Sequence, residues 1–355
     1  MKKIFIAMLA LAAAACAKNE VVSLNQEAIG FDNAFVENST RSVKDPSYTN
    51  DAGKMFSDFA VYGCVENASL FNNVLVSQTM SNDKLNSAWK YENTQYWITG
   101  AKYNFAAIAP KANGENDVFS VAKDADGNYV GTTVLPFTNT DGTNDLLYAQ
   151  NAQVVGPATD NNGTVAFTFR HILSKVKFSF ENGYNASTAT IKVYDVKIEN
   201  AWRSATATLG VNSTAWGSHA DNGLVLEFGA ATSDTAESNT AEAYAYEKTL
   251  ESYNELLLIP GAAPQVTYTK ENADVTENAY KVTFKVVLLV NGTEVKEYSH
   301  TAYVAFTPVA GNSYDIKATI NAENIDPKNE QEPIEFTVTE ISDWNTENQD
   351  QTLPL

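Results

Sequence analysis

The chain has 355 residues, which is long for one domain and fits two. Hydrophobic residues make up 44% of the sequence and charged residues 19%, so the chain can bury a core and global disorder is excluded. The formal net charge of -19 excludes nucleic acid and anionic membrane surfaces as favourable partners.

The amino terminus has the pattern of an export signal. Two lysines open the chain, and an uninterrupted apolar run from Ile4 to Ala15 follows, too short to span a bilayer as a mature helix. The small residues that end this run stand directly before Cys16, as in a bacterial lipoprotein signal. We expect Cys16 to carry a lipid and to become the new amino terminus; the alternative is an ordinary secretory signal with an incidental cysteine. Cys64 is then left without a disulfide partner in the chain, and we expect it to be buried.

From Met55 onward, short strand-like runs alternate with turn residues, and no stretch keeps a helical period. A first series of expected strands covers 59–62, 73–76, 103–108 and 165–169. A second series covers 175–180, 191–198 (with a bulge inside it), 256–259, 282–290, 298–306 and 314–320. Asp126-Gly127 and Asn291-Gly292 stand where hairpin turns are needed. The pattern predicts an all-β chain of antiparallel sandwiches, with a boundary near 171–174 where the two series meet.

Motifs for catalysis or metal binding are not recognisable in the sequence. His171, His219 and His300 are far apart, and none stands in a metal-ligand spacing. The segment 124–128 resembles a calcium loop, but its glycine comes too early, so we expect a tight turn. Carboxylates are abundant, and a glycosidase pair stays open without any two being singled out. We therefore expect no metal and no cofactor.

Four aromatic residues gather within a short stretch: Trp89, Tyr91, Tyr96 and Trp97. Such a group can form an exposed platform that contacts a glycan, or it can pack into the core and turns of the first domain. Both interpretations stay open at the level of sequence.

Several segments, in this order, resemble the fimbrillins, the type V pilins of Bacteroidales-type bacteria. The resemblance covers most of the chain and is carried by Tyr96-Trp97 with the segment 103–110, by Asn144-Asp145-Leu146-Leu147-Tyr148-Ala149, by the segment Phe167 to Val176, by Leu257-Leu258-Ile259-Pro260 and by Gly311-Asn312-Ser313-Tyr314. It implies two tandem transthyretin-like antiparallel β-sandwich domains and no catalysis.

The resemblance also implies a route of assembly. Members are exported as lipoproteins, with palmitate among the expected lipids, and anchored in the outer membrane. An arginine-specific protease then removes an amino-terminal strand, and a donor strand from another pilin subunit, of the same or a different kind, replaces it in an extracellular pilus. In this sequence the expected cleavage lies between Arg41 and Ser42, and Ile29 and Phe31 belong to the displaced strand. The expected organisation is a signal at 1–16, a propeptide strand at 17–41, a first domain at 42–172 and a second domain at 173–355.

A candidate donor strand lies near the carboxyl end. Ile334, Phe336 and Val338 alternate with polar residues, which is typical of a half-buried strand. Trp344 and a polar tail follow. Three apolar side chains that enter a vacated groove contribute roughly 1.5–3 kcal/mol each. The sequence leaves open whether this strand is exchanged or folds back on its own domain.

Three functions compete at this point. The first is a structural or tip subunit of a surface pilus for cell adhesion. The second is a surface-anchored lipoprotein that binds carbohydrate through the 89–97 aromatics and never polymerises. The third is a secreted hydrolase that uses unidentified carboxylates. A pilus anchor resembles the first but needs no removable strand. Arg41 and the terminal strand therefore favour the first function.

Overall fold

The computed structural model describes residues 27–36, 58–77, 80–81, 84–85, 89–113, 116–157, 163–184, 188–228, 231–232, 245–246, 255–270, 273–328 and 334–341. Almost all regular structure in these segments is strand, which confirms the all-β prediction; a short 3₁₀ turn lies at Lys111–Asn113. Cys16, Arg41, Ser42 and Trp344 lie outside the described residues. Within those residues, no helix has the length and apolar character needed to cross a membrane.

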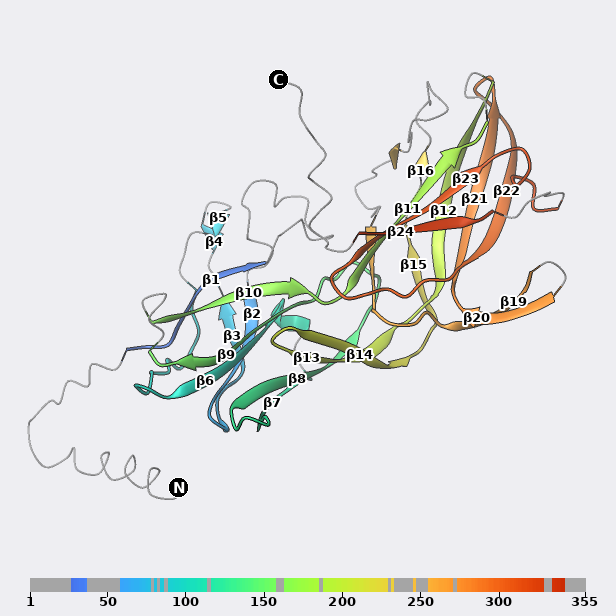
Figure 1. The fold of residues 1–355 in the computed structure, drawn as a ribbon. Helices are drawn as coiled ribbons and strands as arrows, with labels where there is room; N and C mark the ends of the chain where they lie inside the picture. The colour runs from blue at the N-terminus through green and yellow to red at the C-terminus, as the bar shows by residue number, and fades with distance from the viewer. Residues whose placement is uncertain are drawn as a thin grey trace, which may run out of the picture.

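The first half of the chain forms a six-stranded sheet in the order β1-β10-β9-β6-β2-β3 (Figure 1). The strands are β1 (Gly30–Val36), β10 (Thr164–His171), β9 (Leu147–Val155), β6 (Lys102–Ala109), β2 (Asp58–Val65) and β3 (Ala68–Ser77). All neighbours are antiparallel except β1, which runs parallel to β10. Parallel neighbours need a long crossover, and here most of the first half of the chain separates the two strands.

A second, four-stranded sheet covers one face of the first, with the order β14-β13-β8-β7. Its strands are β14 (Ser213–Ala220), β13 (Ser204–Gly210), β8 (Tyr129–Thr138) and β7 (Val118–Lys123). Leu135, Ala207 and Leu209 of this sheet pack in one core with Tyr62 and Ile108 of the first sheet. The other face of the first sheet carries a separate core. Burial on both faces explains why β2 and β6 are apolar at successive positions instead of alternating.

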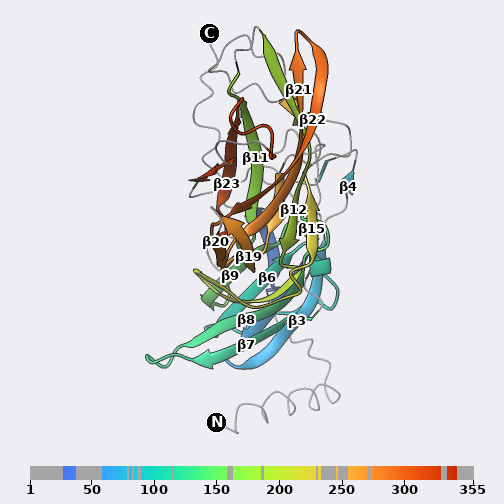
Figure 2. The same ribbon diagram turned by 90° about the vertical axis from the view of Figure 1, so that its right-hand side faces the viewer.

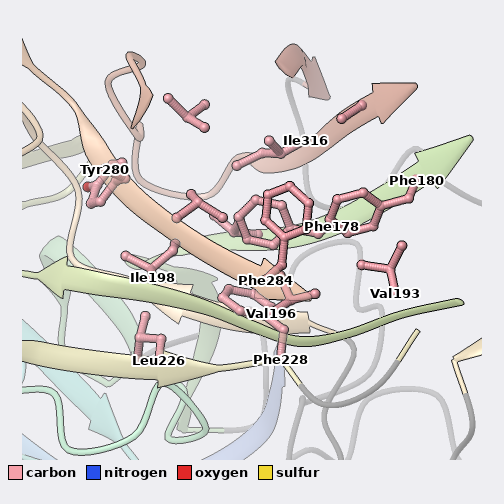
Figure 3. Packing of buried hydrophobic residues seen from close by; sticks show 14 of the residues in the cluster. Phe178, Phe180, Val193, Val196, Ile198, Leu226, Phe228, Tyr280, Phe284 and Ile316 are labelled. Atoms are coloured by element: carbon pink, nitrogen blue, oxygen red, sulfur yellow. The ribbon is translucent and has the colours of Figure 1, made fainter. Parts of the chain in front are cut away.

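The second half of the chain forms another pair of sheets around its own core (Figure 3). One sheet has the order β18-β11-β23-β24, with β18 (Glu255–Leu258), β11 (Ser174–Asn182), β23 (Ser313–Ile320) and β24 (Phe336–Ile341). The other runs β17-β16-β12-β21-β22, and β15 also pairs with β12; its members are β17 (Ala245–Tyr246), β16 (Ala231–Thr232), β12 (Ala189–Ala201), β21 (Tyr280–Val290), β22 (Thr293–Val304) and β15 (Leu224–Glu227). Phe178, Val196 and Phe284 are among the buried residues between these sheets.

Two hairpins stand apart from the four sheets: β19 (Gln265–Lys270) with β20 (Ala273–Asn278), and β4 (Met80–Ser81) with β5 (Lys84–Leu85). The β19–β20 ribbon extends beside the second pair of sheets, and Tyr268 stacks on Tyr303 of β22 with ring centroids 3.9 Å apart. Figure 2 shows the elongated molecule, with β7 and β8 near one end and the β21–β22 turn at the other.

Local sequence signals explain several turns. Asn291 and Gly292 both have positive φ, 50° and 75°, the geometry of a tight hairpin turn between β21 and β22. The carboxylate of Asp124 accepts hydrogen bonds from the backbone N–H groups of Asp126 and Asn128, so the segment is a tight turn, as expected. The register of β12 shifts between Tyr194 and Lys197, which confirms the bulge expected within 191–198.

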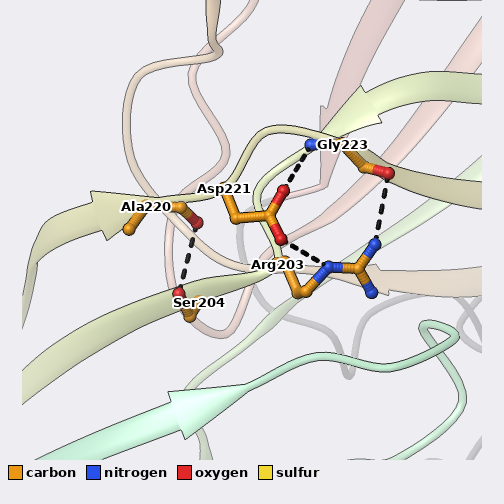
Figure 4. A network of polar contacts seen from close by, with 5 residues as sticks. All are labelled: Arg203, Ser204, Ala220, Asp221 and Gly223. Carbon is orange, nitrogen blue, oxygen red and sulfur yellow. Dashed lines mark hydrogen bonds and ion pairs between the residues drawn. The ribbon is translucent and has the colours of Figure 1, made fainter.

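Besides the connection from β10 to β11, the chain passes twice more between the two pairs of sheets, at 202–203 and at 221–223, because the β13–β14 hairpin pairs with β8 of the first half. Polar contacts join these two passages (Figure 4): the Arg203 guanidinium donates to the Asp221 carboxylate at 2.8 Å and to the Gly223 carbonyl at 3.2 Å. Asp221 also accepts from the Gly223 N–H, and this bond, more than Arg203, lowers the pKa of its carboxyl group. The strands within 204–220 therefore belong to the sheet of β7 and β8. The domain boundary near 172 stays a prediction.

Candidate functional site

The groove that β1 occupies is lined by aromatic rings. Phe31 is 4% exposed, and its ring lies 5.3–6.4 Å from five others, all centroid to centroid: those of Phe59, Phe71, Tyr91, Phe105 and Phe167. Ile29 is 1% exposed in the same core. Aromatic pairs at these separations contribute beyond their buried area. β1 therefore fills a groove that would otherwise expose a cluster of rings.

The main chain around β1 is held from two sides. On one side β1 pairs in parallel with β10, with Phe31 opposite Val165. On the other side the Ile29 N–H donates to the Gln95 carbonyl at 2.8 Å, and the Trp97 N–H donates to the Glu27 carbonyl at 3.0 Å. An edge strand normally has a partner on one side only, so this arrangement is firmer than that of an ordinary edge.

The segment 89–97, which we call the clasp, bridges the two edge strands of the first sheet. Lys90 exchanges backbone hydrogen bonds with Ser77 at the end of β3, at 2.9 and 3.0 Å. At the other end, Tyr96 forms a bridge with Ala28 just before β1. The clasp thus closes the open side of the curled sheet over the buried rings.

Tyr91 is the clasp residue that touches β1 in two ways. Its ring lies 5.3 Å from that of Phe31, and its hydroxyl donates to the Ile29 carbonyl at 2.6 Å. The same hydroxyl oxygen accepts a hydrogen bond from the Gln95 N–H. Burial is the main cause that raises the pKa of Tyr91, so the hydroxyl remains a donor at neutral pH.

The aromatic residues considered as glycan contacts do not share one environment. Trp97 is 3% exposed, and its indole N–H donates to the Gly163 carbonyl at 2.8 Å. Trp89 and Tyr91 are half-buried against the core, whereas Tyr96 is 49% exposed. The clasp therefore directs most of this aromatic surface toward the groove of β1. A cleft of about 680 Å³ lies between β3 and the clasp, with Tyr91 in its wall.

The candidate donor strand β24 is folded back at the edge of its own sheet. It pairs antiparallel with β23, with Ile316 opposite Val338. The Phe336 ring lies 5.9 Å from each of the rings of Phe178, Phe180 and Phe284. Ile334, Phe336 and Val338 are only partly buried against the second core.

The junction between β10 and β11 is fastened by residues from the motifs that carried the family resemblance. The buried side chains of Asp145 and His171 are 2.7 Å apart, which brings two separate motifs together. The Leu173 carbonyl accepts a hydrogen bond from the Gly311 N–H at 2.9 Å, and the Ser174 hydroxyl donates to the Val309 carbonyl at 2.7 Å. Sequence reasoning used these residues as markers and missed this structural role, although an acidic residue and a histidine in successive motifs were a visible signal.

The described residues offer little for catalysis. No cluster of three or more His, Cys, Asp or Glu side chains that could hold a metal is found among them. The His219 Nε2–H donates to the Pro260 carbonyl at 2.8 Å, and His300 is stacked on Phe284. Cys64 is buried, as expected, and burial raises the pKa of its thiol, which lowers its reactivity.

Comparison with known proteins agrees with this architecture. Residues 40–344 match the sequence model of a family described as fimbrillin-like. A fimbrial protein from Bacteroides vulgatus has a similar structure, with a TM-score of 0.53 and 15% identity over 88% of this chain and 98% of that one. The tip fimbrial protein Mfa3 from Porphyromonas gingivalis is more distant, with a TM-score of 0.35 and 9% identity over 89% of this chain and 98% of that one. Among curated protein sequences, none matches this chain significantly.

Proposed function

Because this chain belongs to the fimbrillin-like family, we propose that it is a subunit of a surface pilus that serves cell adhesion. In this proposal the chain is exported, carries lipid on Cys16 and is held at the outer membrane. An arginine-specific protease cuts after Arg41, and the mature subunit that begins at Ser42 assembles with other pilin subunits by strand exchange. The proposed organisation is two transthyretin-like domains at 42–172 and 173–355, with the β13–β14 hairpin of the second range pairing with β8 of the first.

The observation that carries this proposal is the position of β1. It is an edge strand whose Ile29 and Phe31 side chains are buried, yet it makes its covalent connection to the body only through residues 37–57. A cut in that connection leaves β1 held by pairing and packing alone. Its departure exposes the unpaired edge of β10 beside a groove of aromatic rings, which is a template for a strand of another chain.

The test is electron microscopy of purified protein before and after treatment with an arginine-specific protease. We expect filaments only after cleavage, and none from Arg41→Ala. Lys44→Ala is the matched control, because it removes a neighbouring basic residue that such a protease ignores. Filaments of Arg41→Ala with an intact amino-terminal segment would contradict strand removal. Cleaved wild-type protein that forms no filaments would favour a non-polymerising surface lipoprotein.

Lipidation has a separate test, because it is independent of assembly. Mass spectrometry of the membrane-bound form should show an acylated terminus at Cys16. A free amino terminus at another position within 10–20 would contradict lipid anchoring and leave the strand-removal step untouched.

A further inference from the structure

The sheet β14-β13-β8-β7 covers the first sheet with one face and turns its other face outward. Leu135, Ala207 and Leu209 point into the shared core, so the residues that alternate with them lie on the outward face. The pairing of the strands places four outward residues in one row across the sheet: Val118, Val134, Thr208 and Ala215. All four are exposed, Val118 by 61% and Val134 by 38%, so this row offers apolar surface to a partner.

The outward face of this sheet, which we call the neutral face, carries no charge. Its side chains lie within 118–122, 130–138, 204–210 and 213–217, and all are those of valine, threonine, serine, alanine, proline or glycine. Charged residues stand only at its ends, Lys123 and Asp124 at one and Arg203 and Asp221 at the other. Because 19% of the chain is charged, composition does not account for this face.

The outer face of the second half of the chain gives the contrast. There Lys192 of β12 pairs with Glu294 of β22 at 3.1 Å, and Lys285 of β21 pairs with Asp195 of β12 at 3.0 Å. Both sheets bury their inner face against another sheet and expose the outer one. Charges on an exposed sheet face favour solubility and oppose association. The neutral face lacks this protection, which is typical of a surface that is covered by a partner.

We propose that the neutral face is an interface between two copies of this chain, packed face to face about a twofold axis near Val134 and Thr208. These two residues occupy the middle of the exposed row. Regular sheets pack face to face with their strands nearly aligned, and a twofold axis lets one surface serve both partners. The inference goes beyond the proposed function, because it needs neither cleavage nor strand exchange.

The charge of the chain selects a second copy as the partner. A nucleic acid or an anionic membrane needs basic side chains, which the neutral face does not have. A charged protein surface would bury its charges here without a counter-charge, at a high cost in free energy. Two copies with a net charge of -19 repel each other, and they repel least where both surfaces are neutral. The partner must be regular and uncharged, and the neutral face itself meets both conditions.

The side chains of the neutral face lose little freedom on association. Threonine and valine are branched at Cβ and keep few rotamers in a strand, and alanine and glycine have no rotamers to lose. The hydroxyls of Thr206 and Thr208 can bond across the contact, directly or through water. The ordering cost that long charged side chains would impose is therefore small.

The size of the neutral face predicts a weak contact. Four strands about 4.8 Å apart and about seven residues long, at roughly 3.3 Å per residue, give roughly 450 Å² per copy. A stable complex buries about 800 Å² per partner, so we expect one pair of faces to associate weakly and reversibly. In a filament of the proposed kind the contact is repeated from subunit to subunit, which would join filaments side by side.

The test is a charge swap at Thr208. Sedimentation velocity of uncut full-chain protein, from micromolar to millimolar concentration, measures self-association while β1 stays in place. We expect wild type to associate weakly, and Thr208→Glu and Thr208→Lys each to raise the dissociation constant at least tenfold, because like charges then meet across the axis. An equimolar mixture of the two variants should associate again, since opposite charges meet. Recovery in the mixture also shows that both variants are folded.

Thr301→Glu and Thr301→Lys are the matched controls, because Thr301 is an exposed threonine of β22 in the other half and the net charge changes equally. We expect both to associate as wild type does. A mixture of the Thr208 variants that associates no more than either variant alone would overturn the pairing of two neutral faces. Equal effects at Thr301 and Thr208 would also overturn it, as would wild type that stays monomeric throughout. Filament formation after cleavage is not needed for any of these outcomes, so the proposed function and this inference can fail separately.

Discussion

The two edge strands β1 and β24 each place a phenylalanine against a core but are held differently. β1 has main-chain partners on both sides and places Phe31 among five rings, whereas β24 pairs with β23 and places Phe336 among three. The loss of β1 removes a large buried contact, which is why its proposed removal begins with a covalent cut. The apolar side chains of β24 are only partly buried against a core whose fully buried members lie elsewhere in the chain, so we expect β24 to be held less firmly.

The difference follows from the two cores. The core beneath β1 contains aromatic rings from five of the six strands of the first sheet, all but β9, and Phe31 contacts rings from β2, β3, β6 and β10. The core beneath β24 lies between two sheets, and its fully buried members come from other strands. β1 is part of its core because Phe31 lies among the buried rings. β24 is less integral to its core because its side chains are only partly buried at the edge.

The largest expected effect is that of Phe31→Ala. Removing a fully buried ring from a packed site costs about 3–5 kcal/mol, because the surrounding rings collapse only partly. Chemical denaturation of the uncut protein should show this loss for the first half of the chain. A loss below about 1 kcal/mol would mean that β1 is not integral to its core.

Phe336→Ala is the matched change in β24, and we expect a smaller loss. A half-buried side chain at an edge contributes about 1–2 kcal/mol, less than complete burial does. The same denaturation experiment compares the two variants. A loss from Phe336→Ala equal to that from Phe31→Ala would contradict the contrast in how firmly the two edge strands are held.

The pH dependence of stability also tests this contrast, because the buried His300 reaches β24 only through the neighbouring Phe284. His300 stacks on Phe284 at 5.1 Å, and Phe284 contacts Phe336. Burial lowers the pKa of His300 below its usual 6.5, although the Ile325 backbone and the Asp326 charge act in the opposite direction. The folded state then binds fewer protons than the unfolded state, so stability is complete above pH 6.5 and is lost as the pH falls through the lower, folded-state pKa.

Melting curves between pH 7.5 and pH 5, a range chosen to bracket the usual histidine pKa, measure this effect. We expect the melting temperature to fall more steeply for wild type than for His300→Phe, which keeps the stacked ring and removes the titrating group. Parallel slopes for the two proteins would show that other groups cause the acid sensitivity.

Local features of the fold were readable from the sequence. The Asn291-Gly292 turn, the bulge of β12 and the alternation in β24 depend on neighbours within a few residues, and the structure has all three. Pairing partners were not readable, because period-two alternation specifies which face is buried and not which strand lies alongside. The parallel β1–β10 pair and the pairing of β13 with β8 both join segments distant in sequence.

The candidate site could be predicted in part, because local alternation again indicates which side chains are buried. The alternation of Ile29 and Phe31 indicated a strand with one buried face, and both side chains are buried. The role of the clasp was hidden, because Trp97 and Tyr91 looked equally suited to an exposed platform or to a core. Only the curl of the first sheet, which brings Phe71 of β3 within 5.5 Å of Phe31 of β1, requires a cover there.

The smallest expected effect isolates a single hydrogen bond of the clasp. Tyr91→Phe keeps the ring against Phe31 and removes the hydroxyl that donates to the Ile29 carbonyl, a bond worth about 1 kcal/mol. Once the chain is cut after Arg41, release of the amino-terminal fragment should therefore become about fivefold faster, as such a loss implies. Tyr96→Phe is the control, because Tyr96 is 49% exposed and its hydroxyl should not affect β1. Size-exclusion chromatography of the cut proteins over time gives both rates. Equal rates for Tyr91→Phe and Tyr96→Phe would show that the Tyr91 hydroxyl contributes nothing to the retention of β1, and that the ring of Tyr91 and the backbone bonds of the clasp account for its part in holding the strand.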